Sequence, residues 1–184
     1  MRNSEFVIVD VETTGLSPRT GDRIVEIAAI RVKDLKPADR FYALVNPQRD
    51  ISYGAFLVNR ITREMLRDAP PACQVLPDFI QFVGRAVLVG HNVKFDLGFL
   101  TLELELSGCS WPADVVAWDT MMIARRLLPG LGSYSLWSVA HSLGMDVEQQ
   151  HRAMADVELT FFVFRKLLKI AGRREIGDIR ILAQ

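Results

Sequence analysis

Two acidic residues come at the end of a strand-like run near the start of the chain. Residues 6–16 read FVIVDVETTGL, and their β-branched content before Asp10 and Glu12 favours a strand. Because successive side chains of a strand point to opposite faces, the two carboxylates would share one face. Neighbouring carboxylates raise each other's pKa unless a cation intervenes, and Mg²⁺ binds both carboxylates and phosphates. This stretch alone leaves a second interpretation open, in which both acids are solvated as the strand leaves the sheet.

Two further acids and a histidine occur later in the chain. Asp96, in HNVKFDLGFL, opens a predicted helix, where the helix dipole favours a carboxylate, so by itself it is an ordinary first-turn acid. The segment HRAMAD holds His151 and Asp156 five residues apart, which corresponds to about 140° on an ideal helix. They cannot share a helical face, so we expect His151 on the loop that enters the helix and Asp156 on the helix itself. A lone histidine gains interest only together with these acids.

The elements that would position these residues follow from local patterns. Apolar, β-branched runs predict three strands joined by short polar loops, 17–22 and 33–39, as an antiparallel meander. Thr62 would cap a helix that stops before two prolines, and Pro77 weakens the helix that follows. Two short apolar strands alternate with helices before a helical C-terminal part, which predicts an α/β fold with a mixed sheet. The predicted strands are 6–12, 23–32, 40–47, 85–92 and 114–120, and the helices 61–71, 72–84, 94–108, 120–130, 135–144 and 151–172.

Composition restricts the classes of protein that the chain can represent. Its 184 residues suit one domain, and 22 basic against 22 acidic residues leave no basic excess for wrapping nucleic acid. An enzyme that holds a few phosphates through metal ions remains compatible with that balance. Cys73 and Cys109 form no CxxC pattern, so a disulfide framework or zinc ribbon is not expected and the cytoplasm is the simplest location. No signal peptide or membrane helix is expected.

The three segments DVETTGL, HNVKFDLGFL and HRAMAD, in this order, resemble the motifs of the DEDDh 3′–5′ exonucleases. That family includes the epsilon proofreading subunit of bacterial DNA polymerase III and ribonuclease T. The resemblance covers residues 5 to about 168 and implies an RNase H-like fold, a five-stranded mixed sheet flanked by helices. It predicts one exonuclease domain over 1–184, with a short C-terminal tail.

The resemblance also implies roles for the acids and the histidine. Asp10 would bridge two divalent ions, Mg²⁺ or Mn²⁺, Glu12 and Asp156 would complete one site, and Asp96 would support the second, partly through water. Two such ions can clamp an in-line displacement at phosphorus. His151 would be the general base, since a histidine with an ordinary pKa near 6.5 can take a proton from water near neutral pH.

Positions that would contact the substrate follow from the same resemblance. The backbone after the first acidic pair would meet the terminal nucleotide, and a glycine there allows close approach. Phe95 could stack on a base or simply pack in the core, and the two interpretations are level. Asn59 and Arg60 stand where the family often has a His-Gly pair, and Asn59 can still form a hydrogen bond. The expected substrate-binding residues are Thr13, Thr14, Gly15, Leu16, Asn59, Asn92 and Phe95.

Other polar residues have simpler expected roles. Asp119, which ends a predicted strand in WDT, is expected to be a helix N-cap and not a metal ligand. His91 is expected to position the loop that follows it, and His141 to lie in a helix.

The sequence therefore predicts a metal-dependent 3′–5′ exonuclease that releases nucleoside monophosphates from single-stranded DNA ends, in proofreading or repair. RNA 3′-end trimming is the alternative, because nothing in the motifs reads a 2′-hydroxyl. A DNA polymerase is a candidate partner, but the short expected tail favours a stand-alone enzyme or a differently docked subunit. A catalytically silent nucleic-acid-binding module would lack an acid or the histidine, whereas all five are present. The oligomeric state stays open.

Overall fold

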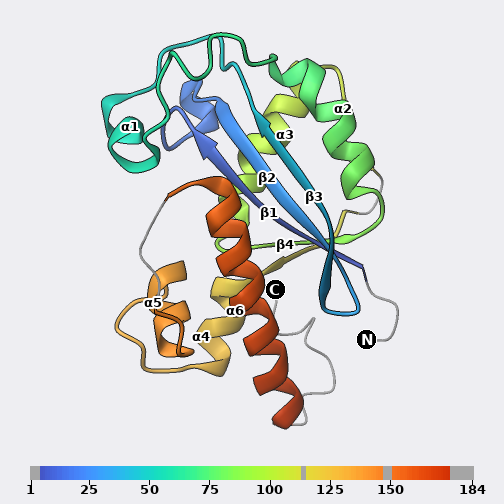
Figure 1. Cartoon of the computed structure of the whole chain (residues 1–184), viewed down its shortest axis with the longest axis vertical. Coiled ribbons are helices and arrows are strands. Elements are labelled where there is room, and N and C mark those ends of the chain that lie inside the picture. Colours follow the sequence, from blue (N-terminus) through green and yellow to red (C-terminus); the bar gives the residue numbers. More distant parts are fainter. Residues whose placement is uncertain (1–4, 113–114, 147–150, 175–184) are drawn as a thin grey trace.

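Five strands form a mixed sheet at the centre of the computed structural model, which describes residues 5–112, 115–146 and 151–174 (Figure 1). The strand order is β3-β2-β1-β4-β5, with β1–β2 and β2–β3 antiparallel and β1–β4 and β4–β5 parallel. The predicted α/β architecture, with a mixed five-stranded sheet and flanking helices, is confirmed. The predicted C-terminal tail beyond residue 174 lies outside the described residues. The strands are β1 Phe6–Thr13, β2 Ile24–Lys33, β3 Lys36–Leu44, β4 Val87–Gly90 and β5 Ala117–Asp119.

Helices cover both faces of the sheet (Figure 1). On one face, Val7 and Val9 pack in a core with Phe79 of α2 and Phe99 of α3. On the other face, Phe6 and Ile8 pack with residues of α4, α5 and α6. This separation follows from the alternation of side chains along β1, because adjacent residues point to opposite faces. The helices are α1 Tyr53–Asn59, α2 Ala72–Val83, α3 Lys94–Leu106, α4 Thr120–Leu127, α5 Leu136–Ser142 and α6 Ala153–Arg173.

The carboxyl end of β1 is where these elements place functional side chains. β1, β4 and β5 run parallel, so their carboxyl ends meet at the same edge of the sheet. The loops after these strands lead into the next elements, and α3 begins shortly after β4. α6 packs directly against β1 and β2, with its first turn near that edge.

The predicted polar loop at 33–39 is shorter in the structure. Asp34 and Leu35, with φ of 50° and 57°, form a two-residue turn between β2 and β3. β3 therefore begins at Lys36 and includes Pro37, which pairs with Val32 beside a register shift. A proline fits here because β3 is an edge strand, where one side of the backbone forms no ladder.

The helix predicted at 61–71 is wrong. Thr62 Oγ1 does accept a hydrogen bond from the Met65 amide, at 3.3 Å, but residues 63–68 form only turns. The helix lies earlier, as α1, where the Ser52 hydroxyl accepts a hydrogen bond from the Ala55 amide. Arg60, with φ of 57°, ends that helix in the left-handed region and turns the chain away. The helix with Pro77 continues through it as α2.

None of the helices in the described part of the chain is both long and apolar enough to cross a bilayer. Neither cysteine forms a disulfide.

Candidate active site

The acids of the three motifs converge at the carboxyl end of β1. Asp10 and Glu12 lie on the strand and Asp156 in the first turn of α6, and oxygen atoms of these three lie within 4.8 Å of one another. Asp96 approaches from the first turn of α3, and its Oδ1 accepts a hydrogen bond from the Val11 amide at 3.0 Å. The β1 backbone therefore lies between the acid of α3 and the acid of α6 and links both helices to one strand end.

Burial dominates the electrostatics of this cluster. It is the largest cause that raises the pKa of all four acids: Glu12 to about 8, Asp96 to about 7 and Asp156 to about 6. The pKa of Asp10 is raised well above its usual range, first by burial and then by the charges of its acidic neighbours. Without a cation, the cluster thus retains protons near neutral pH. Full ionisation of the acids near neutral pH is therefore favoured by a compensating positive charge.

The donor set suits a hard divalent cation. Asp156 Oδ1 is buried and accepts no hydrogen bond from any residue in the described ranges, so this acceptor faces the cluster without a partner. Asp10, Glu12 and Asp156 can each contribute a carboxylate oxygen, the ligand type that Mg²⁺ and Mn²⁺ prefer. A cation among these oxygens would both supply the missing partner of Asp156 and offset the mutual repulsion. The residues therefore fit a metal site.

His151 lies on the loop before α6, as its spacing from Asp156 predicted, with its backbone in the left-handed region at φ of 45°. It borders a cavity of about 500 Å³ together with Asp10, Asn92 and Asp156. Partial burial lowers the pKa of its imidazole below the ordinary value. The side chain is therefore neutral at pH 7 and able to accept a proton.

A second cavity, of about 610 Å³, lies on the other side of Glu12. Leu16 on its rim is 87% exposed. Asn59 is buried, and its amide donates to the Thr13 carbonyl at 3.3 Å and accepts from the Ile61 amide. This cavity brings together the predicted substrate residues Thr13, Gly15, Leu16, Asn59 and Phe95, whereas Asn92 borders the cavity of His151.

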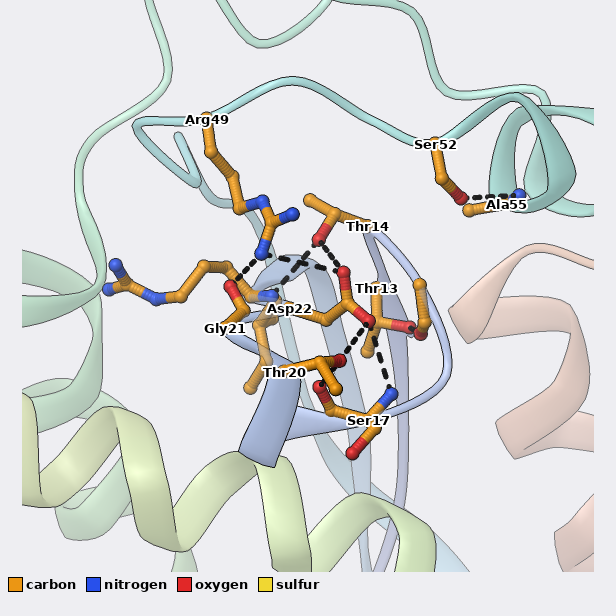
Figure 2. A network of polar contacts seen from close by, with 12 residues as sticks. Thr13, Thr14, Ser17, Thr20, Gly21, Asp22, Arg49, Ser52 and Ala55 are labelled. Carbon is orange, nitrogen blue, oxygen red and sulfur yellow. Dashed lines mark hydrogen bonds and ion pairs between the residues drawn. The ribbon is translucent and has the colours of Figure 1, made fainter.

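The side chain of Thr14 has a structural role. Its hydroxyl donates to Asp22 Oδ1 at 3.1 Å and accepts from the Arg23 amide at 3.0 Å (Figure 2). Asp22 also accepts from the Ser17 amide and so holds together the turn after β1. A Cβ atom on Gly15 would lie 2.3 Å from Asp22 Oδ2, so any larger residue here would push the Asp22 carboxylate out of its present contacts. Nothing in the sequence indicates this role for Asp22, which is predicted only to lie in the polar loop 17–22.

Phe95 both packs against the core and lines a cavity, which are the two environments expected for it. Its ring centroid lies 4.9 Å from that of Phe99, and the side chain packs at the edge of the α2–α3 core. The same side chain lines the cavity beside Glu12. Core packing thus holds the ring at the cavity wall.

Asp119 is a helix N-cap, as predicted. Its Oδ1 accepts from the Met121 amide of α4 at 2.8 Å and also from the Asn92 amide at 3.0 Å. His91 contacts Thr120 Oγ1 and the Tyr134 carbonyl through its two ring nitrogens. These contacts position the loop between β4 and α3. His141 lies in α5, as expected.

Sequence reasoning missed Glu26, a fully buried residue of β2 that pairs with Glu12 across the sheet. Its charge raises the pKa of Asp10, Glu12 and Asp156. The signal was present in RIVEIAAIRV, where one glutamate interrupts an otherwise apolar strand. That anomaly is of the same kind as the acids at the end of β1.

Comparisons with known proteins agree with this geometry. A family model described as exonuclease, of the RNase T type, matches residues 7–164. The 3′–5′ exonuclease DinG of Bacillus subtilis is 34% identical over 92% of this chain, and a PolC-type DNA polymerase III of Thermotoga petrophila is 36% identical over 98%. The chain spans 18% of that DinG and 13% of that polymerase, so it corresponds to a small part of each.

Solved structures extend the likeness to the fold. Exonuclease X, in complex with 5′ overhanging duplex DNA, has a TM-score of 0.74 and 31% identity, with 91% of this chain and 93% of that one covered. A zinc-bound complex of E. coli exonuclease I with single-stranded DNA has a TM-score of 0.80 at 24% identity, over 95% of this chain and 42% of that one, and supports the fold alone. With its motifs in place on an RNase H-like fold, this chain belongs to the RNase T-type exonuclease family of nucleases.

Proposed function

We propose that this chain is a metal-dependent 3′–5′ exonuclease that releases nucleoside monophosphates from single-stranded DNA ends. The observation that carries the proposal is the position of the carboxylate cluster, which lies between a nucleotide-sized cavity and a histidine. Two relatives support the reaction class, since DinG is described as a 3′–5′ exonuclease and exonuclease X was solved with DNA.

The carboxylates are proposed to hold two divalent ions, Mg²⁺ or Mn²⁺. Asp10, Glu12 and Asp156 already bring their oxygens close enough for one ion, and Asp96, whose charge acts on Asp10, is available for a second. When bound, such ions make water a stronger nucleophile and stabilise charge on the phosphate and the leaving oxygen. The raised pKa values of the free acids imply that metal binding releases protons from the cluster.

His151 is proposed as the general base that takes the proton of the attacking water. It borders the same cavity as Asp10 and Asp156, and its lowered pKa keeps the imidazole neutral at pH 7. A neutral imidazole is the form that can accept a proton.

The cavity of about 610 Å³ is proposed to hold the terminal nucleotide. Leu16 is exposed and would lose its contact with water when a base covers it. This burial of apolar surface favours binding of any base, because it involves no base-specific hydrogen bond. Phe95 offers an aromatic face to the same space. The turn at Gly15, fixed by Asp22, gives the nucleotide a rigid backbone surface. Thr13 and Asn59 line the pocket, and Asn92 lies on the side of His151.

DNA is proposed as the substrate in preference to RNA because the relatives are DNA polymerases and an exonuclease solved with DNA. The PolC-type relatives make a DNA polymerase a candidate partner, in proofreading, while a repair exonuclease would act alone. The single domain over 1–184 is likewise part of the proposal, as the family match covers most of it.

A degradation assay tests the function. The pure protein is incubated with 5′-labelled single-stranded DNA, or RNA of the same sequence, with Mg²⁺ or Mn²⁺ and then with chelator. A ladder that shortens from the 3′ end of DNA, abolished by chelator and by Asp10→Ala, is expected. Shortening from the 5′ end would refute the polarity, faster loss of RNA would refute the substrate preference, and intact polymers under both metals would refute the function.

A further inference from the structure

Glu26 is a buried carboxylate that the proposed reaction does not use. It lies near the start of β2 with 0% of its surface exposed, directly opposite Glu12 on the neighbouring strand. Burying an unpaired carboxylate costs folding free energy, so the groups that pair with Glu26 indicate its structural role. Its Oε1 accepts hydrogen bonds from the Tyr42 hydroxyl at 2.7 Å and from Arg152 Nε at 3.1 Å. Its Oε2 accepts from the Ala153 amide at 2.9 Å.

Two of these partners, Arg152 and Ala153, belong to the start of α6, whereas Tyr42 lies in β3. Arg152 is the N-cap residue of α6, yet its own side chain makes no capping hydrogen bond. The first amides of a helix need an acceptor, and a negative charge beside them is favourable. Glu26 supplies both from a neighbouring strand, since it accepts from the Ala153 amide. The helix that carries Asp156 is therefore capped by the sheet.

The same contacts restrain the residue just before the helix. His151 has φ of 45°, a conformation that a non-glycine residue keeps only where its surroundings hold it. Arg152 follows directly and is fixed to Glu26 by two guanidinium nitrogens, with Tyr42 as a further contact at 3.1 Å. The backbone on the helical side of His151 is thus tied to β2, the strand beside the one that carries Asp10 and Glu12.

We propose that Glu26 is a positioning residue that, through Arg152 and the Ala153 amide, sets the placement of His151 relative to the carboxylate cluster. The expected effect on kcat rests on the proposed function, whereas the expected effect on the placement of His151 does not. It assigns Glu26 no contact with substrate or metal. Its loss should lower the rate of the chemical step and leave substrate binding nearly intact, because the cavity beside Glu12 does not include Glu26.

The chain provides a matched control in Glu103. This glutamate is 1% exposed, receives Arg23 Nε and Nη2 at 2.7 Å each, and accepts from the Ile24 amide at 3.1 Å. It therefore shares two kinds of contact with Glu26, a forked arginine and a backbone amide, and lacks only a counterpart of the Tyr42 hydroxyl. It joins α3 to β2 instead of joining α6 to β2 and touches nothing in the segment 151–156.

The kinetic test compares Glu26→Gln, Arg152→Lys and Glu103→Gln on single-stranded DNA, below the melting temperature of each. Glu26→Gln is expected to lower kcat about 10-fold to 10²-fold, because a small misplacement of a catalytic group has effects of that size. KM should stay within about threefold of the wild-type value, because the contacts that bind the substrate in its ground state are unchanged. Arg152→Lys keeps the charge but loses the fork, so its kcat should be intermediate. Glu103→Gln should keep the wild-type kcat.

A spectroscopic measurement tests the placement without activity. The chain has three histidines, so ¹³C-labelled histidine gives few ring signals, assigned by His141→Gln and His151→Gln. The His151 signal should shift in Glu26→Gln and stay in place in Glu103→Gln, while that of His91 stays in both. Should Glu26→Gln not fold, Arg152→Lys carries both comparisons, since it leaves the carboxylate and the helix cap in place.

The two failures are distinguishable. If the wild type degrades neither DNA nor RNA, the proposed function fails. The inference about Glu26 is then decided by the His151 signal alone, and an unchanged His151 signal in Glu26→Gln overturns it. If the wild type is active, a wild-type kcat in Glu26→Gln overturns the inference, as does an equal loss of kcat in Glu103→Gln.

Discussion

Individual residues of the site differ in how burial affects them. For Glu12, Asp96 and Asp156, burial raises the pKa and thereby opposes the ionised form that binds metal. For His151, burial lowers the pKa and thereby favours the neutral form that accepts a proton. Burial therefore favours the neutral form of both kinds of group, which leaves the acids dependent on a cation for ionisation near pH 7 and leaves the histidine able to accept a proton.

The role of His151 can be tested at this scale. Replacement by Gln should lower kcat by about 10² to 10⁴, the usual contribution of a general base. In the wild type, the rate should rise with pH as the imidazole loses its proton, with a midpoint below the ordinary 6.5 because its pKa is lowered. The pH–rate profile on single-stranded DNA measures both effects, and the variant should lack this rise.

His141→Gln is the control for that experiment. His141 lies exposed on α5 and lines neither described cavity, so the variant should keep the wild-type rate and pH profile. A wild-type rate in His151→Gln would remove His151 from the role of base.

At the scale of elements, the site depends on how β1 ends and what is attached to it. Alternation along β1 puts Asp10 and Glu12 on the face that α6 covers, and the hydrogen bond from the Val11 amide joins α3 to the same strand end. The turn after the strand is then held by Asp22. Small shifts of this turn would reshape the cavity proposed to hold the nucleotide without moving Asp10 or Asp156.

Gly15→Ala tests that turn. The new Cβ would lie 2.3 Å from Asp22 Oδ2, so the Asp22 carboxylate must move and the hydrogen bonds by which it holds the turn are disturbed; KM for single-stranded DNA should rise about tenfold or more with a smaller effect on kcat. In an Asp22→Ala background the clash is absent, so Gly15→Ala should cost less there than in the wild type. A double-mutant cycle in KM and melting temperature measures the coupling.

Gly98→Ala on α3 serves as the control, because its added Cβ would meet only Pro18 Cγ at an ordinary 3.8 Å. It should leave KM unchanged. Additive effects of the Gly15 and Asp22 substitutions would refute the proposed clash.

The sequence predicted most of this arrangement where one local rule decides the outcome. Alternation fixed the faces of β1, and the five-residue spacing put His151 off the helix that carries Asp156. It failed where the outcome depends on distant partners. The helix predicted at 61–71 is absent, and α1 ends just before it at Arg60 in a left-handed conformation. The partners of Glu26 include Arg152, which lies 126 residues later in the chain.

At the scale of the whole molecule, the formal charges balance while acids concentrate at one end of β1. The chain has equal numbers of basic and acidic residues, yet Asp10, Glu12 and Asp156 gather within a few ångströms, with Glu26 close behind. Arg152 compensates Glu26, but in the described residues no salt bridge reaches the other three. The folded state without metal therefore carries an electrostatic penalty that depends on pH.

The sign of that penalty predicts how stability changes with pH. The acids have higher pKa values folded than unfolded, with Glu12 raised from 4.5 to about 8 and Asp156 from 3.8 to about 6. Between those values the folded state binds more protons, so stability should fall as pH rises from about 4 to 8. The lowered pKa values of His91 and His151 act oppositely, but over the narrower range below 6.5.

Thermal melts in chelator should therefore show a melting temperature that declines between pH 5 and 8, and excess Mg²⁺ or Mn²⁺ should raise it most at pH 8, by several degrees. The reason is that the cation replaces the protons that the cluster otherwise retains, and fewer protons remain to displace at high pH. The double variant Asp10→Asn/Asp156→Asn removes two of the charges but leaves Glu12 and Asp96, so it should show a shallower decline and lose most of the metal effect. A metal effect equal in wild type and double variant would place the bound cation elsewhere on the molecule.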